Sequence, residues 1–235
     1  MRICCVSDLH GRLPDIPQCD VLAIAGDICP DYRGGRRLSV EPQIAFLNGP
    51  FAEWIGRQPC RQVVGCYGNH DWAGCDAPEQ ISLLVSSWIK TDQQTVIDGV
   101  KFWSTPWQPW FGDWAFTAPR DDEAFLRERW RLIPDDTDVL IVHGPPRGSG
   151  DLAVSGSRSG SISLTERIRQ ISPLLVVCGH IHEGYGVRHL GRTTIASASL
   201  HNLQFLPLNH PILFDLSTSI DAKTCVVARA IVQRG

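Results

Sequence analysis

The sequence has no long apolar run, no strong positive charge and no pair of cysteines at C-x-x-C spacing. No stretch approaches the roughly 18 consecutive apolar residues that a membrane-spanning helix needs. The apolar run at the start of the chain, residues 3–6, is too short for the core of a secretory signal. We therefore expect a protein without a membrane segment that stays in the cytoplasm.

The charge balance excludes a broad electrostatic attraction to polyanions. The 22 lysines and arginines are outnumbered by 25 aspartates and glutamates, which gives a net charge of −3. Without a basic surface, we expect no membrane partner and regard nucleic acid as an unfavourable one. Apolar residues make up 43% of the chain and charged residues 20%, so the composition excludes a disordered protein. The length of 235 residues predicts a single domain over 1–235.

The nine cysteines are more than this kind of composition usually holds, and their number is odd. A disulfide framework that pairs all of them within one chain is therefore impossible, and the spacing argues against a zinc ribbon or a thioredoxin-like site. Several cysteines, such as Cys4, Cys5 and Cys178, lie inside apolar runs. We expect reduced thiols that pack as small apolar side chains.

Short apolar runs alternate with amphipathic segments along the first three quarters of the chain. The runs predict buried strands at 3–6, 21–25, 62–67, 139–142 and 174–178. Helical spacing predicts helices at 44–55 (bent or restarted at Gly49-Pro50), 123–132 and 164–171. The last part predicts strands at 187–190, 193–196, 211–215 and 224–231. Two domains are possible, but the loop-like segment 144–160 leads directly into further elements, which favours two packed sheets with helices outside.

Polar side chains follow five of the predicted strands, at the point where each strand ends. They are Asp8 and His10, Asp27, the run from Asn69 to Asp71, His143, and His180 with His182. Ligands of open α/β sheets bind at the carboxyl ends of the strands. Aspartate, asparagine and neutral histidine offer the oxygen and nitrogen atoms that suit divalent metals, and a carboxylate such as that of Asp27 can serve two ions. The pattern predicts a metal site at this edge.

The ordered motifs resemble those of the calcineurin-like metallophosphoesterase superfamily over residues 8–182. They read Asp8-x-His10, Gly26-Asp27, Gly68-Asn69-His70-Asp71, His143-Gly144 and Gly179-His180-x-His182. The segments 104–109, 143–146 and 179–186 are similar to those of metallophosphoesterase-domain proteins and their bacterial relatives. The resemblance implies an α/β fold, a four-layer α/β/β/α sandwich of two mixed sheets flanked by helices.

The resemblance also implies a centre with two divalent metal ions. Asp8, His10 and His182 would hold the first ion. Asn69, His143 and His180 would hold the second, and Asp27 would bridge them. Mixed nitrogen and oxygen ligands suit Mn²⁺, Fe or Zn²⁺, and we expect Mn²⁺ to support activity in vitro.

Two further residues receive catalytic roles from the same motif. By similarity to the family, His70 faces the leaving group and stabilises or protonates it. Asp71 either orients the His70 imidazole or caps the helix that follows. A hydroxide that bridges the two metals would attack phosphorus in line, while the metals neutralise the developing charge.

The expected function is hydrolysis of a small phosphodiester, nucleotide-like and including cyclic nucleotides. The alternatives are a phosphomonoesterase or protein phosphatase, a nuclease, and a non-catalytic scaffold that binds metal. Trp107 and the other aromatic residues of 103–116 would stack a nucleobase or fill the core. Arg147 and Arg158, in the segment 144–160, would reach a phosphate oxygen or face solvent. His201 and His210 have no assigned role.

Overall fold

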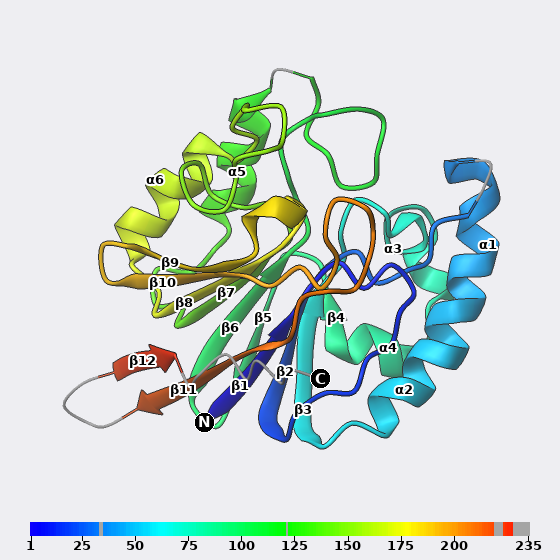
Figure 1. Cartoon of the computed structure of the whole chain (residues 1–235), viewed down its shortest axis with the longest axis horizontal. Helices are drawn as coiled ribbons and strands as arrows, with labels where there is room; N and C mark the ends of the chain where they lie inside the picture. The colour runs from blue at the N-terminus through cyan, green and yellow to red at the C-terminus, as the bar shows by residue number, and fades with distance from the viewer. Residues whose placement is uncertain (33–34, 121, 219–222, 228–235) are drawn as a thin grey trace.

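The computed structural model describes residues 1–32, 35–120, 122–218 and 223–227, and they form two six-stranded sheets flanked by helices (Figure 1). The first sheet has the order β12-β11-β1-β2-β3-β4. Its strands are β1 (Arg2–Val6), β2 (Cys19–Ala25), β3 (Cys60–Cys66), β4 (Ile89–Lys90), β11 (Ile212–Thr218) and β12 (Lys223–Val227). Strands β1 to β4 are parallel, whereas β11 and β12 pair antiparallel.

The second sheet has the order β5-β6-β7-β8-β10-β9. Its strands are β5 (Gln93–Ile97), β6 (Val100–Thr105), β7 (Val139–Val142), β8 (Leu175–Cys178), β9 (Gly186–Leu190) and β10 (Thr193–Ser197). The four central strands β6, β7, β8 and β10 are parallel, and the two edge strands are antiparallel to their neighbours. Both sheets are therefore mixed.

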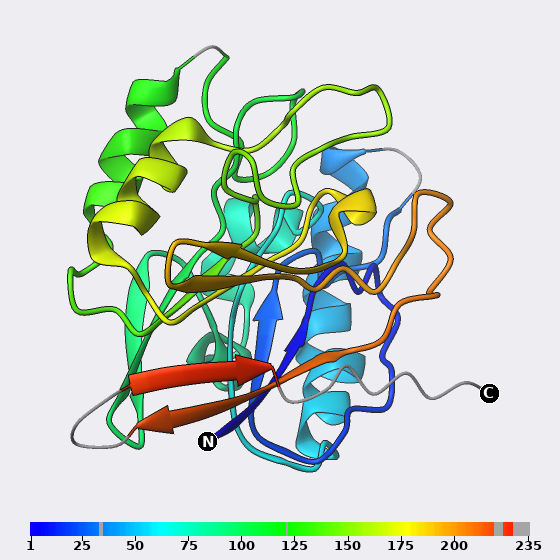
Figure 2. The same cartoon turned by 60° about the vertical axis from the view of Figure 1, so that its left-hand side comes forward.

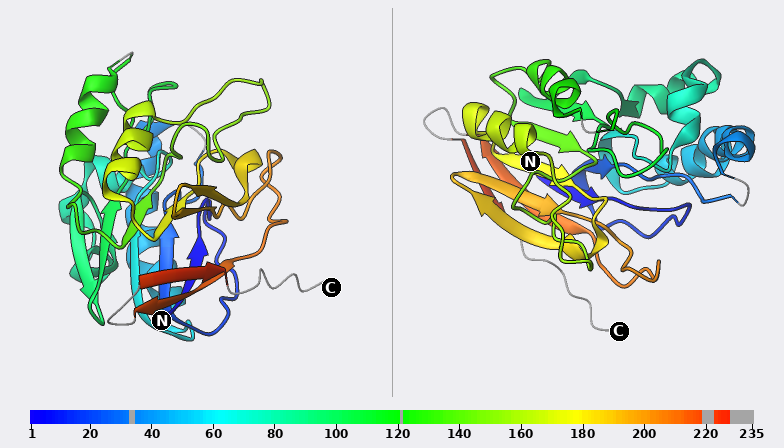
Figure 3. Two further views of the ribbon diagram at one scale, coloured as in Figure 1. Left: turned by 90° about the vertical axis from the view of Figure 1, so that its left-hand side faces the viewer. Right: turned by 90° about the horizontal axis from the view of Figure 1, so that it is seen from above.

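Helices cover the outer face of each sheet, as Figure 1 and the view from above in Figure 3 show. The first sheet is covered by α1 (Arg36–Phe46), α2 (Ala52–Gly56), α3 (Trp72–Asp76) and α4 (Leu83–Trp88). The second is covered by α5 (Glu123–Arg131) and α6 (Ile162–Ile171). A π-helical turn, Leu47–Phe51, joins α1 to α2 and contains Gly49 and Pro50. The predicted bend in this helix is thus a change of helix type.

Strand alternation divides the apolar residues between separate cores. In β1, Ile3 and Cys5 point between the sheets, whereas Cys4 and Val6 point towards the helices of the first sheet. A third core lies between the second sheet and α5 and α6, around Trp130. Because neighbouring strand residues face opposite sides, each sheet is apolar on both faces. The predicted four-layer α/β/β/α sandwich is confirmed.

The predicted helices begin and end at local signals. The side chain of Asp122 accepts a hydrogen bond from the Phe125 amide at the start of α5, and Ser161 accepts one from Leu164 at the start of α6. Helix α6 ends at Ser172, which has a left-handed backbone and precedes Pro173. Both helices lie where helical spacing predicted them, with ends shifted by up to two residues.

The apolar patterns did not predict the strands between 89 and 105. Strand β5 lies at a sheet edge, and most of its side chains are exposed or half-buried, so it lacks an apolar run. Strand β6 mixes Lys101 and Ser104 with apolar residues. The predicted strand 224–231 begins within β12, and its residues 228–231 lie outside the described part of the chain.

The carboxyl ends of the two sheets meet at one point. The Ser7 amide, just after β1, donates a hydrogen bond to the Ala198 carbonyl after β10, and the Leu200 amide donates one to the Ser7 carbonyl. In Figure 2 the end of β1 and the segment after β10 approach each other there. Loops from both sheets therefore converge on the same edge. Across the described residues, every helix is too short or too polar to cross a membrane.

Candidate metal centre

The predicted metal-binding side chains come together from the ends of five strands. Asp8 and His10 follow β1, Asp27 follows β2, and Asn69 follows β3. His143 follows β7, and His180 and His182 follow β8. Three overlapping groups bring their possible ligand atoms within 4.8 Å of one another: Asp8, His10 and His182; His10, Asp27 and His70; and Asp8, Asp27 and His143.

Four of these residues have an unusual left-handed backbone. The φ angles are +56° at Asp8, +45° at His10, +52° at Asp27 and +67° at His180. This conformation is costly for residues with a side chain, and it recurs at functional sites. Hydrogen bonds hold it, because the Asp8 amide donates to the Gly26 carbonyl and the His10 amide to the Asp27 carbonyl.

Close packing of the loops explains one of the motif glycines. A Cβ atom at Gly179 would lie 2.2 Å from the Asp8 carboxylate and 2.0 Å from the Ser7 hydroxyl. Any side chain at this position would push Asp8 out of the cluster. Glycine here lets the chain that carries His180 approach the end of β1.

The first half of the cluster joins Asp8, His10 and His182. His182 Nε2 lies 3.4 Å from Asp8 Oδ1 and 3.4 Å from His10 Nε2. The other ring nitrogen of His182, Nδ1, donates to the Asn202 carbonyl over 3.0 Å. This hydrogen bond leaves the Nε2 lone pair of His182 facing Asp8 and His10.

The second half of the cluster joins Asn69, His143 and His180. Asn69 Oδ1 lies 2.9 Å from His143 Nε2 and 2.8 Å from His180 Nδ1. His143 Nδ1 donates to the Ala25 carbonyl over 2.8 Å, so its Nε2 also faces the cluster. Asp27 lies between the halves, with Oδ2 3.3 Å from His143 Nε2 and 3.9 Å from His10 Nε2.

The chemistry of this donor set fits divalent cations. Carboxylate, amide and imidazole atoms with lone pairs converge in a region that is almost wholly buried. Burial opposes protonation of His143, but the Asp27 carboxylate outweighs it and raises the pKa of His143 to about 9. Burial and His143 together lower the pKa of His180 to about 3. Converging acceptors of this kind are satisfied by a bound cation.

His70 faces the cluster and contacts an aspartate that the sequence did not single out. Its Nδ1 atom pairs with the Asp31 carboxylate, and its backbone amide donates to Asp27 Oδ1 over 2.8 Å. Burial disfavours the imidazolium, but the charges of Asp27 and Asp31 raise the pKa of His70 above its usual value. Asp31 thus makes the contact with the His70 ring that was considered for Asp71.

The Asp71 side chain does not cap the following helix, and its hydrogen bonds go to backbone amides. Its buried carboxylate accepts hydrogen bonds from the backbone amides of Ile28 at 2.9 Å, Cys29 at 2.8 Å and Gly68 at 2.7 Å. Although Asp71 precedes α3, its side chain makes no capping hydrogen bond to that helix. The carboxylate instead joins the loop after β2 to the loop after β3, and it is too fully engaged there to orient His70.

The substrate-binding predictions are partly corrected. Trp107 Nε1 donates to Asp92 Oδ2 over 2.9 Å, and its ring packs against the cores of both sheets. The neighbouring Trp110 and Phe111 instead line a cavity of about 520 Å³. Arg147 and Arg158 line this same cavity, whereas the smaller cavity of about 180 Å³ over the metal centre has neither among its lining residues.

The loop 201–210 contributes residues to the site that carry no motif. The Asn202 carbonyl holds His182, and His201 Nδ1 donates to the Asp8 carbonyl over 2.5 Å. Phe205, with a strained φ of +54°, places its ring 4.9 Å from that of His10 and 5.2 Å from that of His182. A bulky residue with a left-handed backbone is uncommon and recurs at functional sites.

Comparisons with known proteins agree with the fold and with the expected family. The calcineurin-like phosphoesterase family model matches residues 1–184. Metallophosphoesterase domain-containing protein 1 of Homo sapiens is 34% identical over 245 aligned residues, covering 92% of this chain and 71% of that protein. UPF0046 protein T07D4.2 of Caenorhabditis elegans is 28% identical and covers 92% of this chain and 60% of its own length.

Among solved structures, the protein TT1561 of Thermus thermophilus is similar in fold, with a TM-score of 0.57 and 15% sequence identity. The match covers 97% of this chain and 99% of that one. The ordered motifs and the layered fold point the same way as the family model, which spans more than half of the sequence. The chain belongs to the calcineurin-like phosphoesterase family.

Proposed function

We propose that this protein is a binuclear metal-dependent phosphodiesterase whose substrates are nucleotide-like phosphodiesters, cyclic nucleotides included. The carrying observation is the convergence of seven oxygen and nitrogen ligands with Asp27 between two halves. Membership of the family supports the broader class, a metal-dependent phosphoric ester hydrolase. The chain is expected to act as one domain in the cytoplasm.

Each half of the cluster would hold one divalent cation. Asp8, His10 and His182 would bind the first, and Asn69, His143 and His180 the second. Asp27 would contact both. Mn²⁺, Fe and Zn²⁺ suit this mixture of ligands. Two cations bound here would lower the pKa of a water molecule and polarise a phosphoryl oxygen.

His70 and Asp31 would act on the leaving group. With Nδ1 paired to Asp31, the imidazole turns its other nitrogen away from that carboxylate, and His70 lines the cavity over the cluster. A proton held on that Nε2 atom would pass to the departing oxygen, and the positive ring would stabilise its charge. Asp31 acts as a positioning residue, because it holds the ring and the tautomer.

Aromatic side chains shape the space around the reacting phosphate. Phe205 and Phe111 line the cavity of about 180 Å³ over the cluster, and Phe111 packs edge-on to His180 with ring centroids 4.9 Å apart. These rings give the cavity an apolar rim. The cavity of about 520 Å³ beside it, with Trp110 and Phe111, is large enough for a nucleoside arm of a diester.

Two measurements test the proposal. Metal analysis of the purified protein should find two equivalents of a divalent metal, and the loaded protein should cleave bis-p-nitrophenyl phosphate faster than p-nitrophenyl phosphate. Faster cleavage of the monoester would favour the phosphomonoesterase instead. A metal-loaded protein that cleaves no phosphoester would favour the scaffold. The net charge of −3 is unfavourable to a nuclease that binds long DNA.

A further inference from the structure

Two arginines line the cavity next to the metal centre rather than the centre itself. The small cavity over the cluster shares Phe111, His180 and Glu183 with the cavity of about 520 Å³, and only the larger one includes Arg147 and Arg158 in its lining. A phosphate held over the metals would therefore lie in the small cavity, whose lining does not include these guanidinium groups. Their position needs another explanation.

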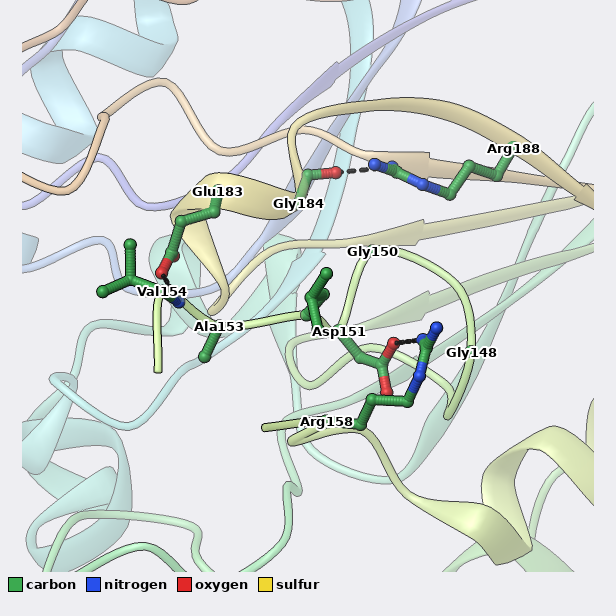
Figure 4. A pocket seen from close by; sticks show the side chains of 10 residues that line it. Gly148, Gly150, Asp151, Ala153, Val154, Arg158, Glu183, Gly184 and Arg188 are labelled. Carbon is green, nitrogen blue, oxygen red and sulfur yellow. Dashed lines mark hydrogen bonds and ion pairs between the residues drawn. The ribbon is translucent and has the colours of Figure 1, made fainter. Parts of the chain in front are cut away.

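A buried carboxylate pairs with Arg158 and lies near Arg147. Asp151 is fully buried, with Oδ1 2.8 Å from Arg158 Nη1 and Oδ2 4.0 Å from Arg147 Nε (Figure 4 draws the Arg158 pair). The two arginine side chains are 47% and 44% exposed. Burying a carboxylate is costly unless cations compensate it. Here that carboxylate fixes the Arg158 guanidinium at a cavity wall, and Arg147 Nη1 donates to the Arg158 carbonyl over 3.1 Å.

The loop that carries these residues is anchored at its base and near its tip. The Arg147 amide donates to the Ser161 carbonyl over 3.0 Å, and the Val154 amide donates to Glu183 Oε1 over 2.7 Å, a contact visible in Figure 4. The loop also crosses the turn after His182 so closely that a Cβ at Gly184 would lie 2.0 Å from the Gly150 carbonyl oxygen. The loop that carries the two arginines is therefore anchored to the neighbouring segments.

The acidic groups beside the arginines are themselves engaged. Glu123 Oε1 accepts hydrogen bonds from the Ser161 hydroxyl and from the amide and hydroxyl of Ser163. Glu183 accepts the Val154 amide. Each guanidinium has five N–H donors, and Asp151 takes only one from Arg158 by a hydrogen bond. Both arginines therefore retain donors for an anion.

Two aromatic side chains line the same cavity as the arginines. Trp110 and Phe111 are 41% and 45% exposed and line the cavity that the arginines share. Aromatic faces of this kind accept flat ring systems. A ligand that runs from the metals to the arginines would thus have an anionic group, a flat organic part, and a second anionic group.

We propose that Arg147 and Arg158 form a binding subsite for a second phosphate, so that the substrates are phosphodiesters with a nucleoside arm that carries a further phosphate. Arginine binds phosphate through paired N–H donors, and two fixed arginines are suited to its charge. This inference rests on the proposed phosphodiesterase function. Arg158 also lines an adjoining cavity of about 420 Å³ with Arg188, which leaves room for a longer arm.

Calorimetry on the Mn²⁺-loaded protein tests the subsite by binding alone. Thymidine 3′,5′-bisphosphate should bind at least about tenfold more tightly than thymidine 5′-monophosphate, because it adds charge-assisted hydrogen bonds. In Arg147→Gln and Arg158→Gln this preference should fall to within about twofold. The matched control is Arg61→Gln, an exposed arginine paired with Asp20 and Asp98 at the opposite end of the sheet, which should keep the preference.

Arg158→Gln leaves the Asp151 carboxylate without its partner and could prevent folding. Arg158→Lys keeps a cation beside Asp151 but loses the paired donors, so it should fold and still lose most of the preference. Equal affinity of the wild type for the two ligands would overturn the subsite. So would a preference that survives in Arg147→Gln and Arg158→Lys together.

Kinetics separate failure of the subsite from failure of the proposed function. The substrates are the p-nitrophenyl ester of thymidine 5′-phosphate and the same ester with a 3′-phosphate. The wild type should show a kcat/KM at least about tenfold higher for the second, and the arginine variants should lose this ratio. If the wild type hydrolyses both esters at equal rates, the subsite proposal is wrong and the phosphodiesterase proposal still stands. If the metal-loaded wild type hydrolyses neither ester but keeps the binding preference, the phosphodiesterase proposal is wrong and the subsite proposal still stands.

Discussion

The His70 imidazole is paired with Asp31, four residues beyond Asp27, and not with its chain neighbour Asp71. Asp31 also lies 3.5 Å from His10 Nδ1, so the same carboxylate reaches a residue of the metal cluster. Its position connects the proposed proton donor to the loop that carries the proposed bridging ligand. We therefore expect Asp31 and His70 to act as a unit.

Asp31→Asn should reduce turnover most for esters with poor leaving groups. His70→Ala removes the proton donor and should lower kcat by about 10²-fold or more on phenyl esters, with less effect on p-nitrophenyl esters. Asp31→Asn should show the same leaving-group dependence with a loss of about 10- to 100-fold. The measurement is kcat against leaving-group pKa. Asp98→Asn, at an exposed ion pair with Arg61, serves as the control and should leave the slope unchanged.

Asp27→Ala should lose metal as well as activity, because Asp27 lies between the two halves of the cluster. His70→Ala should keep both metal equivalents while turnover falls. Elemental analysis of each purified variant measures this difference. Asp215→Ala, which removes a surface partner of Arg2, is the control. A fully metal-loaded Asp27→Ala protein would contradict the proposed bridging position.

Removal of metal should lower the melting temperature. The folded chain brings these oxygen and nitrogen atoms together and the unfolded chain does not, so binding of a cation favours the folded state. Saturation at one hundred times Kd contributes about 2.7 kcal/mol, which corresponds to roughly 5–10 °C for a chain of this size. Differential scanning calorimetry with EDTA and with added Mn²⁺ tests this. An unchanged melting temperature would argue that the cluster binds no cation.

Asp71→Asn should destabilise the fold without changing how turnover depends on the leaving group. The substitution replaces an acceptor of three backbone amides by a group that also donates, which leaves buried amides unpaired. The expected loss in the free energy of unfolding is about 2–3 kcal/mol. Urea unfolding measures the loss. A leaving-group slope altered like that of Asp31→Asn would restore Asp71 as the residue that positions His70.

Trp107 and Trp110 should respond differently to substitution. Trp107→Phe loses the hydrogen bond to Asp92 and should cost about 1–2 kcal/mol of stability while KM changes little. Trp110→Ala should raise KM for a nucleoside ester by roughly tenfold, because stacking contributes about 1–3 kcal/mol per base. Thermal unfolding and steady-state kinetics on both variants test this. A raised KM in Trp107→Phe would return that residue to the substrate site.

Much of the fold was predictable because buried strands appear in the sequence as short apolar runs. The runs that became β1, β2, β3, β7 and β8 are mostly apolar, and each is followed within four residues by Asp, Asn or His. The edge strand β5 has no apolar run, because most of its side chains are exposed to solvent or half-buried. Sequence therefore predicted the central strands better than the edges.

The metal cluster was predictable for the same reason. Its seven residues stand at strand ends, and the parallel strands of each sheet bring their carboxyl ends to one edge. The assignment of each ligand came from the resemblance to the family. The residues that tertiary structure added do not share this property. Asp31 and His70 are 39 positions apart, and Asn202 and His182 are 20 apart, on loops without a repeating pattern.

The sequence by itself determined where the central strands lie along the chain and which kinds of ligand follow them, because both follow from local alternation and position. Only the tertiary structure decided that Asp31 serves His70, that Asp71 ties two loops together, and that Arg147 and Arg158 stand over the adjoining cavity. These contacts depend on the path of each loop between the elements. That path is set by packing and by hydrogen bonds between distant residues, which no local pattern encodes.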